Sequence, residues 1–198
     1  MYGDPTCHLK RWETALLFAL CLALCACVWA QGEEERIGNS LIRLHVLAVD
    51  DSAEEQALKL RVRDAVLEDL TARLEGVESR EEASRVLRAS LGEIERSAAG
   101  AAEGRPVTVT LGREHYPTRR YDGFALPAGD YESLRVILGE GEGRNWWCVV
   151  FPPLCLAAES TERLEQALGT ESVQILAGDG TALRFRLLEL WGGLVSRE

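Results

Sequence analysis

The sequence is short of positive charge. Its 198 residues carry 22 Lys and Arg against 32 Asp and Glu, which gives a formal net charge of −10. A protein that follows a phosphate backbone needs basic stripes, or basic patches with aromatic residues between them, and the sequence has neither. The composition therefore argues against nucleic acid as a partner.

Motifs for common hydrolytic and metal chemistry are also missing. The sequence has no G-x-S-x-G, no HExxH and no spaced carboxylate pair to accompany His45. Its C-x6-C pair, Cys148 and Cys155, is not a zinc knuckle, and no histidine lies at ligand spacing from it. We therefore expect no metal and no cofactor. His45 is interpreted as a strand histidine with a partly buried, hydrogen-bonded ring.

The longest uncharged stretch lies near the N-terminus. Lys10 and Arg11 precede residues 15–30, which contain no charge and are shorter than the roughly 20 apolar residues that span a bilayer. This layout predicts an export signal at 1–30, cleaved after Ala30, with an acidic linker at 31–40. An uncleaved signal anchor and lipidation at Cys27 are the alternatives. In each case the membrane is reached only through this segment, and the protein works outside the cytoplasm.

The rest of the chain, 41–198, predicts one domain, because 46% of the residues are hydrophobic and low-complexity tracts are lacking. Leu41 to Val49 is typical of a strand. Capping boxes beginning at Ser52 and Ser79, each with a Glu three residues later, predict two amphipathic helices that form a hairpin. In each box we expect the Ser hydroxyl and the Glu carboxylate to bond the first free amides.

Alternating apolar residues predict strands after these helices. The pattern begins at Val107, and residues 116–121 are expected to form a bent or edge strand, followed by a turn at 126–130. Residues 134–138 and 146–151 are expected to pair as a hairpin through the glycine-rich segment 139–143. The tail after Val173 fits strand or helix. The fold class is therefore α+β, a mostly antiparallel sheet covered on one face by an N-terminal helical hairpin.

Two tryptophans and two cysteines stand close together. Trp146 and Trp147 are adjacent, so in a strand they point to opposite faces. For Cys148 and Cys155 a disulfide, buried thiols and a catalytic nucleophile all remain open. A bridge requires Pro152 and Pro153 to fold the chain back, because seven extended residues span about 23 Å. We expect a partner-binding surface formed by Arg144, Trp146, Trp147, Tyr116, Arg119, Arg120 and Tyr121.

Two blocks carry a family resemblance. They are IRLHVLAVDDSAEEQALKLRVRDAVL, at 42–67, and LPAGDYESLRVILGEGEGRNWWCVVFPPLC, at 126–155. Both resemble the signature regions of the stage II sporulation protein R family, over roughly 42–191. The positions that carry the family motif are Arg43, His45, Asp51, Ser52, Gln56 and Asp64. One departure is Val49-Asp50 where the family tends to have Asn-Ser, which puts any role of that Asn in doubt.

The resemblance implies an exported, non-enzymatic signal. A protein of this family is made in the forespore and stimulates a membrane aspartic protease of the mother cell, which cleaves a sigma-factor precursor. Two other functions compete with it. One is an extracytoplasmic hydrolase built on His45, Asp51 and Cys148, and the other is a cell-wall-binding module that uses the tryptophans.

Overall fold

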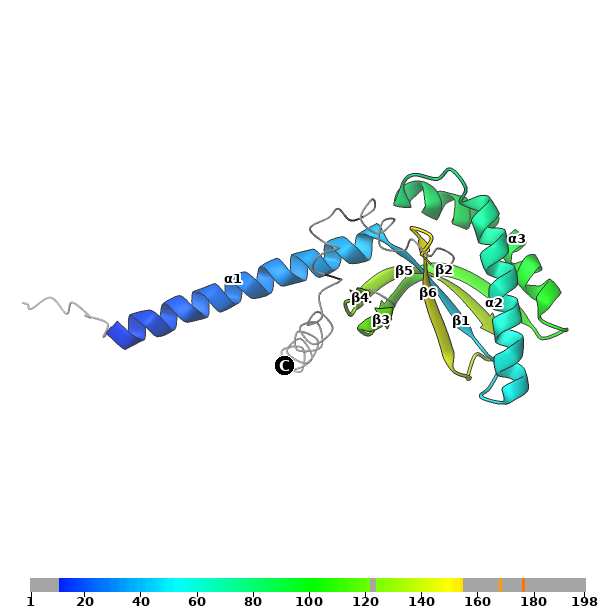
Figure 1. Ribbon diagram of the computed structural model, residues 1–198, viewed down its shortest axis with the longest axis horizontal. Helices are drawn as coiled ribbons and strands as arrows, with labels where there is room; N and C mark the ends of the chain where they lie inside the picture. The colour runs from blue at the N-terminus through cyan, green and yellow to red at the C-terminus, as the bar shows by residue number, and fades with distance from the viewer. Residues whose placement is uncertain (1–10, 122–123, 155–167, 169–175, 177–198) are drawn as a thin grey trace, which may run out of the picture.

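The computed structural model describes residues 11–121 and 124–154, together with Leu168 and Leu176, but not the side chains of 26–31, 33 and 34. In chain order the elements are α1 (Arg11–Ser40), β1 (Ile42–Leu47), α2 (Ala53–Arg73), α3 (Arg80–Ala101), β2 (Val107–Tyr116), β3 (Arg119–Tyr121), β4 (Phe124–Leu126), β5 (Gly129–Leu138) and β6 (Asn145–Phe151). Figure 1 shows α1 extending away from a body in which α2 and α3 cover one side of the sheet. The strand-or-helix question for the tail lies outside the described residues.

The helix α1 joins the exposed N-terminal part to the folded body without a break. Among its first residues, Trp12, Leu16 and Phe18 are all more than 60% exposed. Its last turns are different: Ile37 is fully buried, and Gly38 lies against the backbone of Asp130 in β5. Within the predicted linker, 31–40, the helix continues to Ser40, and Ile37 and Gly38 are buried. No helix in the described part of the chain reaches the length and apolarity of a membrane span.

The main sheet has the order β2-β5-β1-β6. β1 runs parallel to β5, with Ile42 opposite Glu132, and antiparallel to β6. β2 is antiparallel to β5. The α+β class and the mostly antiparallel sheet are confirmed. The predicted hairpin between β5 and β6 is wrong, because β1 lies between them and pairs with both.

The glycine-rich segment turns at residues 138–141, where the Gly141 amide donates to the Leu138 carbonyl oxygen at 3.0 Å, and then crosses the end of β1. Gly139 and Gly141 have φ angles of +56° and +69°, which residues with a side chain rarely adopt. The Gly143 amide donates to the Ala48 carbonyl oxygen at 3.0 Å, just beyond β1. These contacts bring the start of β6 to the N-terminal end of α2.

Both predicted helix caps are present. The amide of Glu55 donates to Ser52 Oγ at 3.3 Å, and the amide of Glu82 donates to Ser79 Oγ at 3.2 Å. The carboxylate half of the first box is wrong, since Ser52 N donates to Asp50 Oδ1 and the Glu55 carboxylate instead accepts from Arg105 at 2.7 Å. An ion pair between distant segments has replaced the local bond.

Two hydrophobic clusters lie on opposite faces of the sheet. The first joins α2 and α3 to the sheet and includes Leu44, Leu58, Leu87 and Leu134. The second joins the end of α1 to the other face and includes Ile37, Tyr116, Phe124, Tyr131, Leu168 and Leu176. β3 and β4 form a separate two-stranded ribbon, and the expected turn at 126–130 is shorter because Leu126 ends β4 and Gly129 begins β5.

Candidate functional site

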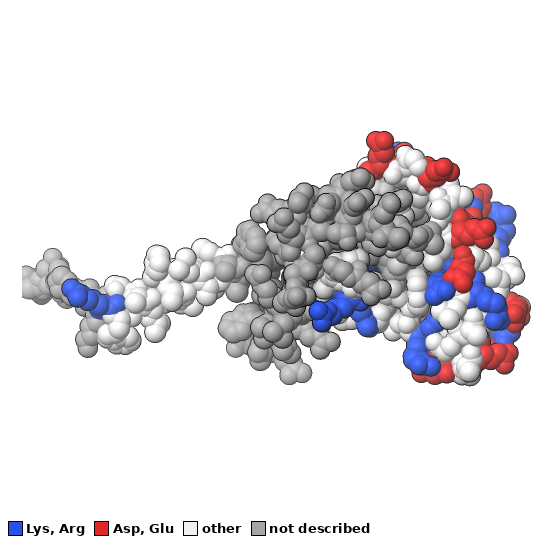
Figure 2. Space-filling model, viewed as in Figure 1, with Lys and Arg blue, Asp and Glu red and all other residues white. Residues whose placement is uncertain are grey.

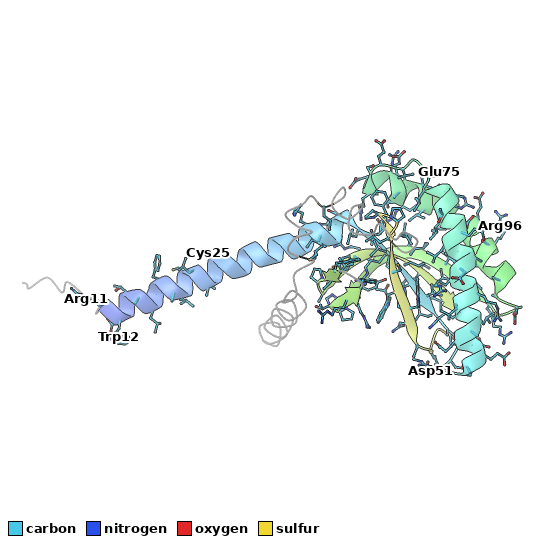
Figure 3. The ribbon with its side chains drawn as sticks, viewed as in Figure 1. Arg11, Trp12, Cys25, Asp51, Glu75 and Arg96 are labelled. Atoms are coloured by element: carbon cyan, nitrogen blue, oxygen red, sulfur yellow. The ribbon has the colours of Figure 1, made fainter. Side chains whose placement is uncertain are left out.

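The sheet face opposite α2 and α3 carries most of the chemistry that the sequence singled out. Strand alternation turns Ile42, Leu44 and Val46 toward the helices, so Arg43 and His45 point to the opposite face. The same alternation in the neighbouring strands adds further polar and aromatic side chains. We call this set the aromatic face; it comprises Arg43, His45, Glu114, Tyr116, Tyr131, Ser133 and Trp147. Figure 3 shows side chains projecting from the strands of the sheet.

His45 is held on both sides. Its Nδ1 lies 2.8 Å from Glu114 Oε1 and its Nε2 lies 2.9 Å from Asn145 Oδ1. The ring is 5% exposed and its centroid is 5.4 Å from that of Trp147. The expected buried, hydrogen-bonded histidine is confirmed. To act as a base on a substrate, this ring would have to give up one of its two contacts.

Glu114 makes the stability of this face depend on pH. Burial alone would raise its pKa, but hydrogen bonding to Ser133 and the nearby His45 outweigh burial, and the pKa lies below its ordinary value. Because the folded-state pKa is lowered, the ionised carboxylate stabilises the fold at pH values above its unfolded pKa of about 4.5. This stabilisation is lost as the pH falls through the folded-state pKa.

We therefore expect the stability difference between wild type and Glu114→Gln to be constant above about pH 6 and to shrink below about pH 4.5. Urea unfolding of both proteins across this pH range measures it. Comparing the two proteins cancels the titration of all other carboxylates. A difference that stays level down to pH 3 would show that Glu114 is not the group responsible.

Arg43 is a fully buried cation stacked on tyrosines. Its Cζ lies 3.8 Å from the ring centroid of Tyr116 and 4.8 Å from that of Tyr131. One Nη donates to the Tyr121 hydroxyl at 2.6 Å. Its Nε and Nη1 have no hydrogen-bond partner in the described part of the chain. Attraction to the ring faces offsets part of the cost of burying this charge.

Arg119 repeats the arrangement on β3. Its Cζ lies 3.7 Å from the ring centroid of Trp147, and its buried Nε also has no partner among the described residues. Burial raises the pKa of both Tyr116 and Tyr121. At neutral pH both hydroxyls therefore keep their protons and can donate. Tyr116 Oη is already engaged with Ser133 Oγ at 2.7 Å.

The structure divides the residues expected to bind a partner between two places. Trp147, Arg119 and Tyr121 gather on the aromatic face, with Arg120 exposed beside them. Tyr116 belongs to this group but is 1% exposed, so it supports the face from beneath. The other two lie across the sheet. Trp146 packs under Arg63 of α2 at 4.9 Å, and the two tryptophans do point to opposite faces, as predicted.

Arg144 and several family-motif residues meet at the N-terminal end of α2. The Arg144 amide donates to Asp51 Oδ1 at 2.7 Å, and Lys59 Nζ donates both to the Arg144 carbonyl oxygen and to Gln56 Oε1. Desolvation, followed by the nearby Arg144 charge, lowers the pKa of Lys59. Ser52 caps the same helix, and Asp64 pairs with Arg63 farther along it. This network holds the glycine-rich segment 139–143, which we call the crossing segment because it crosses the end of β1, against α2.

Sequence reasoning missed Glu114, Asn145, Ser133 and Lys59. The first three act through neighbours on other strands, and the strand order was not predicted. Continuing the alternation from Val107 as far as Tyr116 would have placed Glu114 and Tyr116 on one face. Lys59 is a charged residue of an amphipathic helix, for which exposure is the ordinary expectation, yet it is 4% exposed. No three His, Cys, Asp or Glu side chains within the described ranges gather as a metal site would require.

Cys148 is buried, whereas the free cysteines of the described residues, Cys21 and Cys25, are exposed. Cys155 lies outside those residues, so a bridge between Cys148 and Cys155 stays a prediction. If it forms, Cys148→Ala and Cys155→Ala should each lower the free energy of unfolding by about 2 kcal/mol under oxidising conditions. Chemical unfolding measures this, and alkylation with mass spectrometry should leave both cysteines unmodified. Ready alkylation of both in unreduced protein would exclude the bridge.

Comparison with known proteins points in one direction. The family model described as stage II sporulation protein R matches residues 38–161. A curated relative, Stage II sporulation protein R of Bacillus subtilis (strain 168), is 42% identical over 123 residues, which are 60% of this chain and 55% of the relative. The chain thus spans about half the length of that relative. No solved structure matches. Since the matched residues run from the end of α1 past β6, through the whole sheet, the chain belongs to the stage II sporulation protein R family.

Proposed function

We propose that the chain is a sporulation signal that acts outside the cytoplasm and activates a membrane-embedded aspartic protease, which then processes a sigma-factor precursor. The observation that carries the proposal is family membership across the folded body, residues 38–161. The name of the relative connects that family to stage II of sporulation. The receptor and the cleaved precursor follow from what the resemblance implies.

The geometry supports a binding role in preference to catalysis. Both nitrogens of His45 are engaged, and the Ser133 hydroxyl is engaged with Tyr116. Neither side chain stands free beside a cleft as a nucleophile and base would. A protein without chemistry of its own activates a receptor by binding the active state more tightly than the resting state.

Action outside the cytoplasm is supported by α1. Its N-terminal half presents large apolar side chains to solvent, among them Leu17, Leu20, Leu22 and Leu24. Exposed apolar surface on this scale is costly for a helix that remains in water. An export signal or a membrane-bound segment would remove that surface from water.

Co-expression in a host that does not sporulate tests the function. The full chain is produced with the candidate aspartic protease and the sigma-factor precursor, and precursor cleavage is followed by immunoblot. We expect cleavage only when all three proteins are present and the chain can be exported. Cleavage without the chain, or none with it in cells where the Bacillus subtilis relative succeeds, would contradict the proposal.

His45→Gln separates signalling from catalysis. Because the ring is 5% exposed and engaged at both nitrogens, we expect the variant to be less stable by about 1 to 2 kcal/mol. Signalling should persist in whatever fraction remains folded. Thermal unfolding and precursor cleavage are measured on the same preparations. A variant that is as stable as the wild type but silent would favour the hydrolase.

A further inference from the structure

We infer that the edge of the aromatic face formed by Arg119, Arg120 and Trp147 binds an acidic segment of the partner protein, with Arg43 adding positive charge beneath it. The inference rests on the proposed function only for the identity of the partner. The chemistry of the site, a receptor for Asp and Glu side chains, is argued from the structure alone.

The arginines at this site differ from those on the helix-covered side in their charge partners. On the helix-covered side, Arg61, Arg73, Arg80, Arg88 and Arg105 each pair with a carboxylate. Arg43, Arg119 and Arg120 form no ion pair within the described residues. In Figure 2 basic and acidic atoms alternate over α2 and α3, whereas the basic atoms near β3 and β4 have no acidic neighbour among the described atoms in view. In a chain of net charge −10 this is a local reversal of sign.

Guanidinium donors at this site lack hydrogen-bond acceptors. The Arg119 Cζ lies 3.7 Å from the centroid of the Trp147 ring, and its Nε is buried without an acceptor among the described residues. The Nε and Nη1 atoms of Arg43 also lack acceptors there. A buried donor without a partner costs free energy, and a guanidinium matches a carboxylate through two parallel hydrogen bonds. A carboxylate from outside would supply an acceptor for the partly exposed Arg119 guanidinium, while the fully buried Arg43 adds only its charge from beneath.

The residue types around Arg119 and Trp147 are those of a protein interface. Arg, Trp and Tyr are the residues that dominate protein interfaces, and all three meet at this site. Tyr121 is half-buried, its hydroxyl is held by Arg43 at 2.6 Å and its ring stacks on Phe124 at 5.1 Å. Side chains fixed in this way lose little conformational freedom when a partner binds. Arg119 and Tyr121 point to one face of β3 and Arg120 points to the other, so an acidic segment that lies along the edge of β3 away from β4 meets Arg119 on one side and Arg120 on the other.

Binding of a labelled oligoglutamate peptide tests the inference directly. The full chain is kept in mild detergent and binding is followed by fluorescence anisotropy. The double variant Arg119→Gln/Arg120→Gln is compared with Arg61→Gln/Arg96→Gln, which removes equal charge from side chains that are 50% and 78% exposed on the other side. We expect the first pair to weaken binding at least about tenfold and the control pair to leave it near wild type.

The salt dependence of peptide binding and a comparison with vesicle binding test the inference further. Wild-type binding should weaken as the Debye length falls from about 8 to about 3 Å. Vesicles of phosphatidylcholine with phosphatidylglycerol should bind both double variants equally. If Arg119→Gln/Arg120→Gln loses vesicle binding and keeps peptide binding, the face binds lipid headgroups and the inference is wrong. Failure of the wild type to bind the peptide, or equal weakening by both double variants, would also overturn it.

The co-expression assay separates this inference from the proposed function. If Arg119→Gln/Arg120→Gln still triggers precursor cleavage at the wild-type level, the docking site is wrong and the signalling role stands. If the wild type binds the peptide but never triggers cleavage, the signalling role fails and the acidic-segment site stands.

Discussion

Gly143→Ala should lower the free energy of unfolding by at least about 3 kcal/mol. A Cβ added at Gly143 would lie 2.7 Å from the Asp50 carbonyl carbon and 2.9 Å from the Ala48 Cβ, and closer still to the Asp50 carbonyl oxygen. These are backbone or short, rigid atoms, so relief requires the crossing segment to move as a whole. That movement would break the Gly143 to Ala48 hydrogen bond and separate Arg144 from Asp51.

Urea unfolding followed by circular dichroism measures the effect, and Gly92→Ala is the matched control. Gly92 lies inside α3, where an added Cβ would meet nothing within 4 Å. Alanine is the better helix former, so this control should gain about 0.5 to 1 kcal/mol. Two alanine variants of equal stability would show that the crossing segment does not need its glycine.

Glu132→Ala should lower the free energy of unfolding by about 3 kcal/mol or more. The side chain is 4% exposed in β5 and points toward α3. Its carboxylate accepts from Ser84 Oγ at 2.9 Å and from Arg88 Nη2 at 2.5 Å, and Arg80 Nη2 lies 2.9 Å from its other oxygen. Removing the carboxylate leaves the partly buried Arg80 and the buried Ser84 hydroxyl without their acceptor.

Glu93→Gln is the control for charge, on the helix α3 that Glu132 contacts. Glu93 also contacts two arginines, Arg73 and Arg96, but its side chain is 52% exposed, so the expected loss is below about 1 kcal/mol. Thermal unfolding of both variants gives the comparison. Coupling between Glu132→Ala and Arg88→Gln in a double-mutant cycle would confirm that the pair acts directly. Losses of similar size at Glu93 and Glu132 would contradict the importance of burial.

Local features of the fold were predictable because their causes lie within a few residues. Ser52 and Ser79 cap helices through amides three positions away, and adjacent Trp146 and Trp147 must face opposite ways in any strand. Strand order was not predictable, because nothing between β5 and β6 shows that β1, far earlier in the chain, lies between them. The short glycine-rich connection favours a hairpin on local grounds, and pairing with β1 overrides it.

For the candidate site, individual residues were predictable from the sequence but their contacts were not. His45 could be assigned to a strand from its neighbours, but its contact with Glu114 depends on the packing of three strands. Aromatic and basic residues at 116–121 were reasonable interface candidates by composition. Only the structure shows that Tyr116 is buried and that Arg119 is the one stacked on Trp147.

The position of β1 between β5 and β6 affects how the protein reaches its folded state. β1 is the first strand to leave a ribosome or a translocation channel, yet its partners lie at residues 132–137 and 145–151. Until those residues emerge, Leu44 and Val46 have no strand beside them. Pairing over such a separation is slow and exposes the waiting segment to aggregation. An emerging chain therefore needs a chaperone, or rapid release of its second half, before β5 and β6 can pair with β1.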